Sequence, residues 1–150
     1  MTWPFQRDCD TFYGDPRKKL WKLFNLTYIK PPFVMTYDRK VVKYISIHKK
    51  CAASLSRILQ AIYVASGKDQ RVLNNWGVSI FGGVYNFRLM RNSNRLSMHS
   101  YACAIDLDPA KFPMGQSAEA FPEPVLKAFA DEGWVNLTND RMHFQAAIVG

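Results

Sequence analysis

The sequence predicts an α+β fold, in which a small antiparallel sheet has helices packed against it in a single domain over residues 1–150. Two observations lead to this prediction, and a third places a candidate site on the sheet. A chain of 150 residues, 48% of them hydrophobic, suits one domain with one core. Strand-like and helical segments are mixed along the chain in an order typical of this class. Two of the strand-like segments also hold or adjoin histidine and aspartate residues, which gives the sheet a candidate site.

The N-terminal half predicts a short helix, two strands and a longer helix. Residues 18–26 have the spacing of one or two helical turns with an apolar side. Residues 33–47 are rich in β-branched and aromatic residues and predict two strands around a tight turn at residues 38–39. Residues 50–65 place leucine and isoleucine at helical spacing, and Gly67 is expected to end this helix.

The C-terminal half predicts strands on either side of one helix. Residues 77–90 predict loops and a strand that ends near Arg88. A strand is expected over residues 102–107, a short helix over 124–132 and a final strand over 142–146. The sheet is antiparallel in this prediction, because the strands follow one another without regular helical crossovers.

Alternation along the last two strands decides which side chains share a face. Asp106 is expected to project from the face opposite to Cys103, whose side faces the core. In the final strand, His143 and Gln145 share one face while Phe144 points to the core. Asp106 is therefore expected on a face lined by the small residue Ala104, where a metal could fit.

The charge of the chain is strongly basic. Its formal net charge is +8 at pH 7, carried partly in clusters of lysine and arginine. Such clusters favour a polyanionic neighbour, such as nucleic acid, an anionic membrane surface or an acidic cell-wall polymer. A solvated basic face is the other interpretation, and the charge alone does not choose between them. No helix-turn-helix or base-stacking motif supports a specific nucleic-acid partner.

Cysteine usage and hydropathy point to a reducing compartment. Cys9, Cys51 and Cys103 are widely spaced and odd in number, so reduced thiols are expected rather than disulfides. No apolar run reaches the length of a transmembrane helix. Residues 1–8 lack the charged-then-apolar pattern of a signal peptide.

His48 precedes two lysines and is expected to be an exposed histidine at a strand end.

The most informative residues are His99 and Asp106, followed later by Asp140 and His143. A catalytic zinc typically has three protein ligands from histidine and carboxylate side chains, and its fourth position is left to water. A further carboxylate that is not a ligand can accept the proton of that water. We therefore predict a zinc site at the sheet face, with His99, Asp106 and His143 as ligands and Asp140 as general base. An arginine nearby could instead neutralise Asp106, which would be costly to bury alone.

The pattern Ser97-x-His99-x-x-Ala102-x-Ala104-x-Asp106, followed by Asp140-x-x-His143, resembles the VanY-type peptidoglycan peptidases. This family holds zinc D-alanyl-D-alanine carboxypeptidases and dipeptidases, and the L-alanyl-D-glutamate endopeptidases of phage endolysins. The similarity covers roughly residues 80–146, with a weak N-terminal part. The short chain and the aspartate at position 140 resemble the phage endolysin branch most closely.

The resemblance implies a zinc metallopeptidase, with the same ligands and base, that cleaves peptidoglycan stem peptides. It also implies an arginine that stabilises the oxyanion or anchors the substrate, for which Arg88 is the first choice and Arg91 the second. Ser97 would help to position the substrate, although a capping role is an equally good interpretation. The resemblance further implies a monomer in the cytoplasm of the host bacterium that acts on the wall after release or delivery.

Three departures from the family pattern concern the surroundings of the site rather than its ligands. Alanine stands at position 102, where the family has glycine, which implies less room or a different backbone angle. Residues 133–139 are shorter than the family's tryptophan- and glycine-rich segment, and Phe112-Pro113 stands where the endolysin branch has Asn-Pro.

Three other functions remain open at this stage. A D-alanyl-D-alanine carboxypeptidase would use the same ligands and base on a different bond. A metal-stabilised module that binds the cell wall or an anionic polymer without cleaving it would need no base, so Asp140 argues against it. A basic nucleic-acid-binding protein would show salt-sensitive affinity and no metal dependence.

Overall fold

A four-stranded antiparallel sheet lies at the centre of the computed structural model, which describes residues 2–115 and 119–150. Across the sheet, its strands are β5 (Phe81–Gly83), β6 (Ala104–Leu107), β8 (Asp140–Gln145) and β7 (Val135–Leu137). Met1 and residues 116–118 lie outside the described residues. Residues 116–118 fall between the two parts of the predicted metal site, Asp106 and Asp140.

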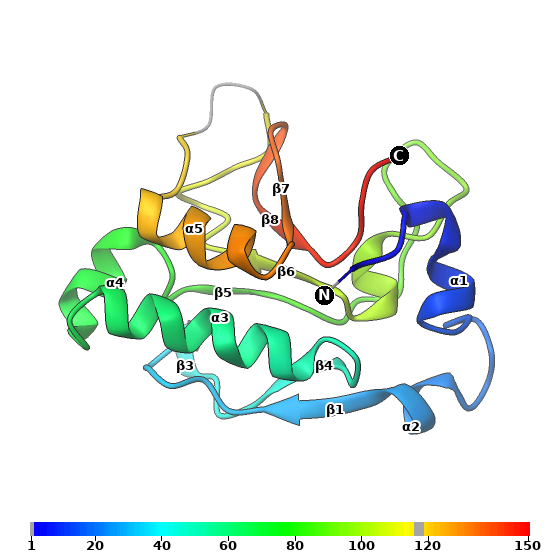
Figure 1. The fold of residues 1–150 in the computed structure, drawn as a ribbon, viewed down its shortest axis with the longest axis horizontal. Coiled ribbons are helices and arrows are strands. Elements are labelled where there is room, and N and C mark those ends of the chain that lie inside the picture. The colour runs from blue at the N-terminus through cyan, green and yellow to red at the C-terminus, as the bar shows by residue number, and fades with distance from the viewer. Residues whose placement is uncertain (1, 116–118) are drawn as a thin grey trace.

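Two helices pack on one side of this sheet. They are α3 (Ala52–Ala65) and α5 (Glu123–Asp131), which lie side by side in Figure 1. The predicted α+β class, with helices packed against a small antiparallel sheet, is confirmed. No helix within the described part of the chain is long and apolar enough to span a bilayer.

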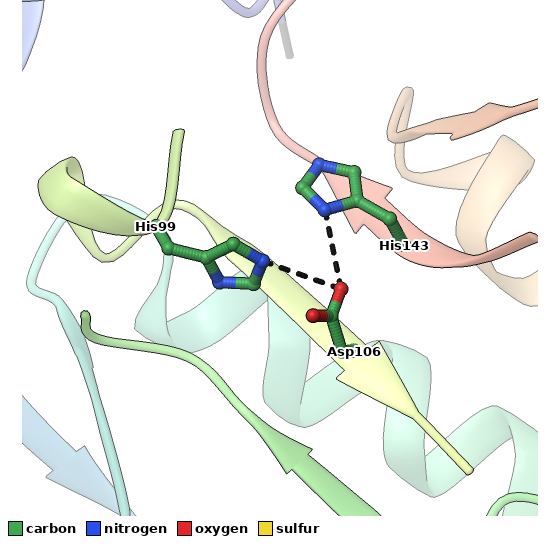
Figure 2. Close-up of side chains that lie close together, drawn as sticks. All are labelled: His99, Asp106 and His143. Carbon is green, nitrogen blue, oxygen red and sulfur yellow. Dashed lines mark hydrogen bonds and ion pairs between the residues drawn. The ribbon is translucent and has the colours of Figure 1, made fainter. Parts of the chain in front are cut away.

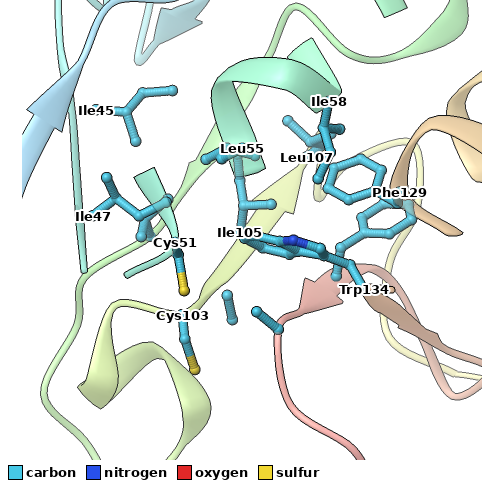
Figure 3. Packing of buried hydrophobic residues seen from close by; sticks show 14 of the residues in the cluster. Ile45, Ile47, Cys51, Leu55, Ile58, Cys103, Ile105, Leu107, Phe129 and Trp134 are labelled. Atoms are coloured by element: carbon cyan, nitrogen blue, oxygen red, sulfur yellow. The ribbon is translucent and has the colours of Figure 1, made fainter. Parts of the chain in front are cut away.

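The hydrophobic core fills the space between the central sheet and these helices. Ile105 and Leu107 of β6 meet Leu55 and Ile58 of α3 there (Figure 3). Because side chains alternate along a strand, the same register turns Asp106 to the opposite face, as predicted. The core therefore fixes the strand that carries the candidate site.

The final strand β8 is held by aromatic packing. Phe144 is fully buried, and its ring stacks on that of Phe129 with the centroids 3.8 Å apart. This packing confirms that Phe144 faces the core while His143 and Gln145 share the other face. All three cysteines are buried and free, as expected for reduced thiols.

The N-terminal half contains two further pairs of strands. β2 (Thr36–Tyr37) and β3 (Lys40–Val41) form a hairpin around the predicted turn, where Asp38 and Arg39 have φ angles of 48° and 64°. The second predicted strand of residues 33–47 is wrong in its pairing: β4 (Ile45–His48) pairs instead with β1 (Leu26–Ile29). Pairing between segments so far apart leaves no local pattern in the sequence.

The first predicted helix is shorter than expected, and a different face of it packs against the core. Helix α2 spans only Trp21–Asn25, since the chain enters β1 at Leu26. Trp21 is its buried residue, and its indole Nε1 donates to the Tyr13 carbonyl oxygen at 2.9 Å. This bond turns the apolar side chains of Leu23 and Phe24 to solvent, although the spacing had suggested a packed face.

Helix α3 ends as predicted at Gly67, which has a φ of 75°. The Gly67 N–H donates to the Val64 carbonyl at 3.0 Å, and the Lys68 N–H donates to the Tyr63 carbonyl at 3.0 Å. This pair of bonds satisfies the last carbonyls of the helix. A helix that the sequence analysis did not predict, α4 (Gln70–Trp76), follows directly.

The strand predicted to end near Arg88 ends earlier, at Gly83. Gly83 has a φ of 110°, and beyond it the chain leaves the sheet. The Asn86 and Arg88 N–H groups donate to the short helix η2 (Met98–Tyr101), at the His99 carbonyl and the Ser100 hydroxyl. Backbone donors that a longer strand would use are thereby taken up by η2.

The prediction that His48 is exposed is wrong, because the residue is fully buried. Its Nε2–H donates to the Tyr13 carbonyl oxygen at 2.9 Å, and its Nδ1 accepts the Lys50 backbone N–H at 3.0 Å. These two bonds specify a neutral imidazole, since a proton on Nδ1 would remove the second bond. His48 therefore joins the N-terminal segment to the start of α3.

Acidification is expected to destabilise the fold through His48. Burial, with the charges of Lys50 and Lys49, lowers the pKa of His48 from 6.5 to about 4. The unfolded chain then binds more protons than the folded one between these pH values, so the free energy of unfolding falls as the pH drops through this window. The loss is on the order of 3 kcal/mol.

Thermal or urea unfolding of the wild type and of His48→Gln, measured from pH 7 to pH 4, checks this expectation. Glutamine keeps a donor for the Tyr13 carbonyl but does not titrate, so the variant's stability should depend less on pH in this window. Equal pH dependence of the two proteins would show that His48 is not the titrating group.

Candidate metal centre

Three side chains converge on the face of the central sheet that is opposite to the core. His99 comes from η2, Asp106 from β6 and His143 from β8, where Asp106 and His143 are register partners. Asp106 Oδ1 lies 3.2 Å from His99 Nε2 and 3.2 Å from His143 Nδ1 (Figure 2). All three candidate ligand atoms lie within 4.8 Å of one another. The structure thus brings together the three residues that the sequence predicted as ligands.

Local turns at both ends of η2 place His99. Ser97 is the N-cap, and its hydroxyl oxygen accepts the His99 backbone N–H at 3.3 Å. Ala102 ends the turn in the left-handed region with φ 53° and ψ 36°. An L-residue in this conformation is strained by roughly 1–2 kcal/mol, a cost that the family's glycine would avoid. Alanine in place of glycine at position 102 therefore costs backbone strain, but the chain still makes the turn that leads into β6.

Hydrogen bonds on the far side of each ring fix the tautomers of the two histidines. The His99 Nδ1–H donates to the Val84 carbonyl oxygen at 2.8 Å. The His143 Nε2–H donates to the Gln145 Oε1 at 2.8 Å. In a neutral ring, the other nitrogen then carries a lone pair. Both lone pairs point at the Asp106 carboxylate.

This arrangement fits a metal ion. In the neutral tautomers, two imidazole lone pairs and a carboxylate oxygen face one another, and His99 Nε2 is buried without a hydrogen-bond partner among the described residues. Acceptors this close repel unless a cation or extra protons lie among them. Two nitrogens and one oxygen also form the kind of ligand set that zinc prefers in catalytic sites.

The electrostatics of Asp106 agree with a ligand role. Burial alone would raise the pKa of this carboxyl, but hydrogen bonds from His143 and His99, with the positive charge of their protonated rings, outweigh burial and hold the pKa well below the usual range. Protons on the two ring nitrogens that face Asp106 thus keep it ionised when no cation lies there. A charged carboxylate is the form that binds a divalent cation.

Asp140 lies beside this cluster without belonging to it. Its Oδ2 is 3.9 Å from His143 Nδ1, and its Oδ1 is buried with no hydrogen-bond partner among the described residues. Burial raises the pKa of Asp140 above its ordinary value, although the neighbouring His143 opposes this. A half-buried carboxylate with a free oxygen, next to the ligands, has the position that the sequence predicted for the base.

A cleft of about 310 Å³ opens beside His143 and Asp140. Arg88, Arg91 and Ser97 also line it, whereas His99 and Asp106 are not among its lining residues and reach it only through their contact with His143. Of the two arginines, Arg88 is the one whose charge acts on Asp140, where it weakly opposes the rise in pKa that burial causes. Ser97 combines its capping role with a position in the cleft wall.

Sequence reasoning missed the groups that support the ligands from behind. The Val84 backbone carbonyl leaves no signal in the sequence. Gln145 had a signal, because its spacing of two from His143 places both on one face of a strand. Gly82 is a third such residue, since a Cβ built there would lie 2.9 Å from both the Cβ and the carbonyl oxygen of Asp106.

Gly82→Ala is expected to lower the zinc affinity of the site, because Gly82 lies on β5 beside Asp106 of β6. The added methyl group meets Asp106 too closely, so β5 and β6 must separate or the carboxylate must move. Overpacking of this kind costs about 1–3 kcal/mol of stability. We expect both a lower unfolding temperature and a weaker affinity for zinc, measured by competition with a chromogenic chelator. A variant with unchanged zinc affinity would show that Gly82 does not control the position of Asp106.

The comparisons with known proteins agree with this geometry. Residues 91–146 match a peptidase family model described as D-alanyl-D-alanine carboxypeptidase. The matched segment is less than half of the chain, and it contains all three candidate ligands and Asp140. It supports the VanY-type resemblance and a peptidase at the level of the family. The comparisons with curated proteins and with solved structures return no match.

Proposed function

We propose that this chain is a zinc metallopeptidase that cleaves peptidoglycan stem peptides, as an L-alanyl-D-glutamate endopeptidase of the phage endolysin type. The observation that carries the proposal is the convergence of His99, Asp106 and His143 beside Asp140. The family match over the same segment supports a peptidase acting on peptidoglycan. His99 Nε2, His143 Nδ1 and the Asp106 carboxylate would hold the metal.

Zinc bound in such a site would lower the pKa of water to about 7 and polarise a carbonyl, which would make a nucleophile available near neutral pH. The residues of this chain then organise the reaction around it. Asp140 accepts the proton of the attacking water as the bond to the peptide carbonyl carbon forms. It returns that proton to the leaving amine as the peptide bond breaks.

Arg88 is proposed as the group that stabilises the oxyanion developing on the peptide carbonyl. Removal of one such donor typically costs on the order of 100- to 1000-fold in rate. Arg91, on the rim of the same cleft, is proposed to bind a free carboxylate of the stem peptide. Ser97 also lines the cleft and is proposed to contact the substrate there.

A D-alanyl-D-alanine carboxypeptidase is the second candidate, and the description of the matching family model favours it. Both reactions use the same ligands and base, so they differ in which residues of the stem peptide occupy the cleft. The endopeptidase assignment depends on aspartate rather than glutamate at position 140.

Digestion of purified peptidoglycan, with and without a chelator, tests the proposal and separates the candidates. Mass spectrometry of the released fragments identifies the new termini. New L-alanine carboxyl ends would support the endopeptidase, and free D-alanine would support the carboxypeptidase. Binding to peptidoglycan without any chelator-sensitive release would contradict both and favour a non-catalytic wall-binding module.

A further inference from the structure

Gln145 occupies a buried position directly behind the candidate ligand His143. It is 1% exposed, and its amide makes three hydrogen bonds. Its Oε1 accepts the His143 Nε2–H at 2.8 Å, while its Nε2 donates to the Gln6 Oε1 at 2.8 Å and to the Ala147 carbonyl at 2.9 Å. Each polar atom of this buried amide thus has a partner.

The partners of Gln145 leave its amide only one orientation. The Ala147 carbonyl can accept but not donate, so the atom facing it must be the NH₂ group. The Oε1 must therefore face His143, where it can only accept. As a result, the His143 proton is held on Nε2 and the lone pair on Nδ1, the nitrogen that faces Asp106 (Figure 2).

Gln6 extends this network into the N-terminal segment. It begins the short helix η1 (Gln6–Asp8), and its backbone N–H donates to the Ile148 carbonyl at 2.9 Å. The Ile148 N–H in turn donates to the Pro4 carbonyl at 2.8 Å, so the two ends of the described chain are paired beside the cleft. The side chain of Gln6 also lines the cleft. Gln6, which is distant in sequence from the candidate ligands, is thus linked to His143 through the side-chain amide of Gln145.

We propose that Gln145 and Gln6 form a positioning relay, which sets the tautomer and ring orientation of His143 and thereby raises the metal affinity of the centre. Gln145 acts on His143 directly, and Gln6 acts by holding the amide of Gln145. This inference rests on the metal-binding part of the proposed function. It adds two residues outside the ligand set and gives the N-terminal segment a role in the site.

Metal affinity, measured without reference to peptidase activity, tests the relay. Zinc affinity is determined by competition with a chromogenic chelator, and cobalt binding is followed through its visible absorption. Loss of a partner behind a ligating histidine typically costs about 10–100-fold in affinity. We expect Gln145→Leu to lose affinity in this range. We expect a smaller loss for Gln6→Leu, because the Ala147 carbonyl still holds the Gln145 amide.

Two further variants separate the relay from a general effect on folding. Gln145→Glu keeps an acceptor for the His143 Nε2–H, so it should retain more zinc affinity than Gln145→Leu. Gln70→Leu, which removes hydrogen bonds to the Val34 backbone far from the site, should bind zinc as the wild type does. Gln145→Leu is compared only where thermal unfolding shows that it is folded; if it does not fold, Gln145→Glu and Gln6→Leu decide.

The outcomes distinguish the relay from the proposed function itself. A folded Gln145→Leu protein that binds zinc with wild-type affinity would overturn the relay. Where Gln145→Leu does not fold, wild-type affinity in Gln6→Leu would overturn it. If the wild type binds neither zinc nor cobalt, the proposal of a metal centre is contradicted, and so is the relay that depends on it. A graded loss, largest in Gln145→Leu, supports the proposal.

Discussion

Replacement of Asp106 by asparagine is expected to abolish both metal binding and peptide hydrolysis. The carboxylate lies 3.2 Å from each imidazole nitrogen, and it is the only anionic member of the candidate ligand set. Asparagine has nearly the same shape but no charge, so the packing of β6 is kept while the attraction for a cation is lost. The loss should exceed the roughly 10–100-fold expected for a residue that only supports a ligand. Metal content by mass spectrometry and fragment release from peptidoglycan measure the two effects.

The matched control for this prediction is His48→Gln. It removes a buried histidine that belongs to the fold but not to the cluster. We expect it to keep one equivalent of metal at neutral pH and to keep peptidase activity. An Asp106→Asn protein that binds metal as tightly as this control would remove Asp106 from the ligand set.

Asp140→Ala is expected to keep its metal and lose most turnover. Asp140 lies 3.9 Å from His143 Nδ1, and its buried Oδ1 has no hydrogen-bond partner in the part of the chain that the structure describes, so it can take a proton. Positioned proton transfer contributes about 10²–10⁴-fold to rate, so a loss of this size in kcat is expected. The ligands stay in place, because the cluster of His99, Asp106 and His143 does not include Asp140.

The control for Asp140→Ala is Asp131→Ala, which removes an exposed carboxylate paired with Lys127 on α5. This variant should retain wild-type kcat and metal content. Full turnover by metal-loaded Asp140→Ala protein would rule out its role as the base. Loss of metal together with turnover would place Asp140 among the ligands instead.

The candidate site could be predicted from sequence because its signals are local. The period of two in the strands turned Asp106 and His143 to one face, and short sequence spacing tied His99 to the first strand and Asp140 to the second. The alternation indicated which face of β6 belongs to the core, and that face packs on α3. Each of these relations depends on residues within a few positions of one another.

The features that escaped prediction depend on contacts distant in sequence. The pairing of β1 with β4 joins a segment for which no strand was predicted to one that was expected to pair across the turn at residues 38–39. His48 is buried because Tyr13 supplies a carbonyl for its ring, although the two lysines after it suggested exposure. The bond between Gln145 and Gln6 spans almost the whole chain, so no local pattern could reveal it.

The central claim is that one divalent ion lies between two imidazoles and the Asp106 carboxylate. A crystal of the protein grown with zinc, with anomalous diffraction recorded at the zinc absorption edge, tests it most directly. We predict a single strong peak about 2.0–2.2 Å from His99 Nε2, His143 Nδ1 and an Asp106 oxygen, with Asp140 outside bonding distance. A peak elsewhere, or none at these three side chains in zinc-saturated crystals, would contradict the account.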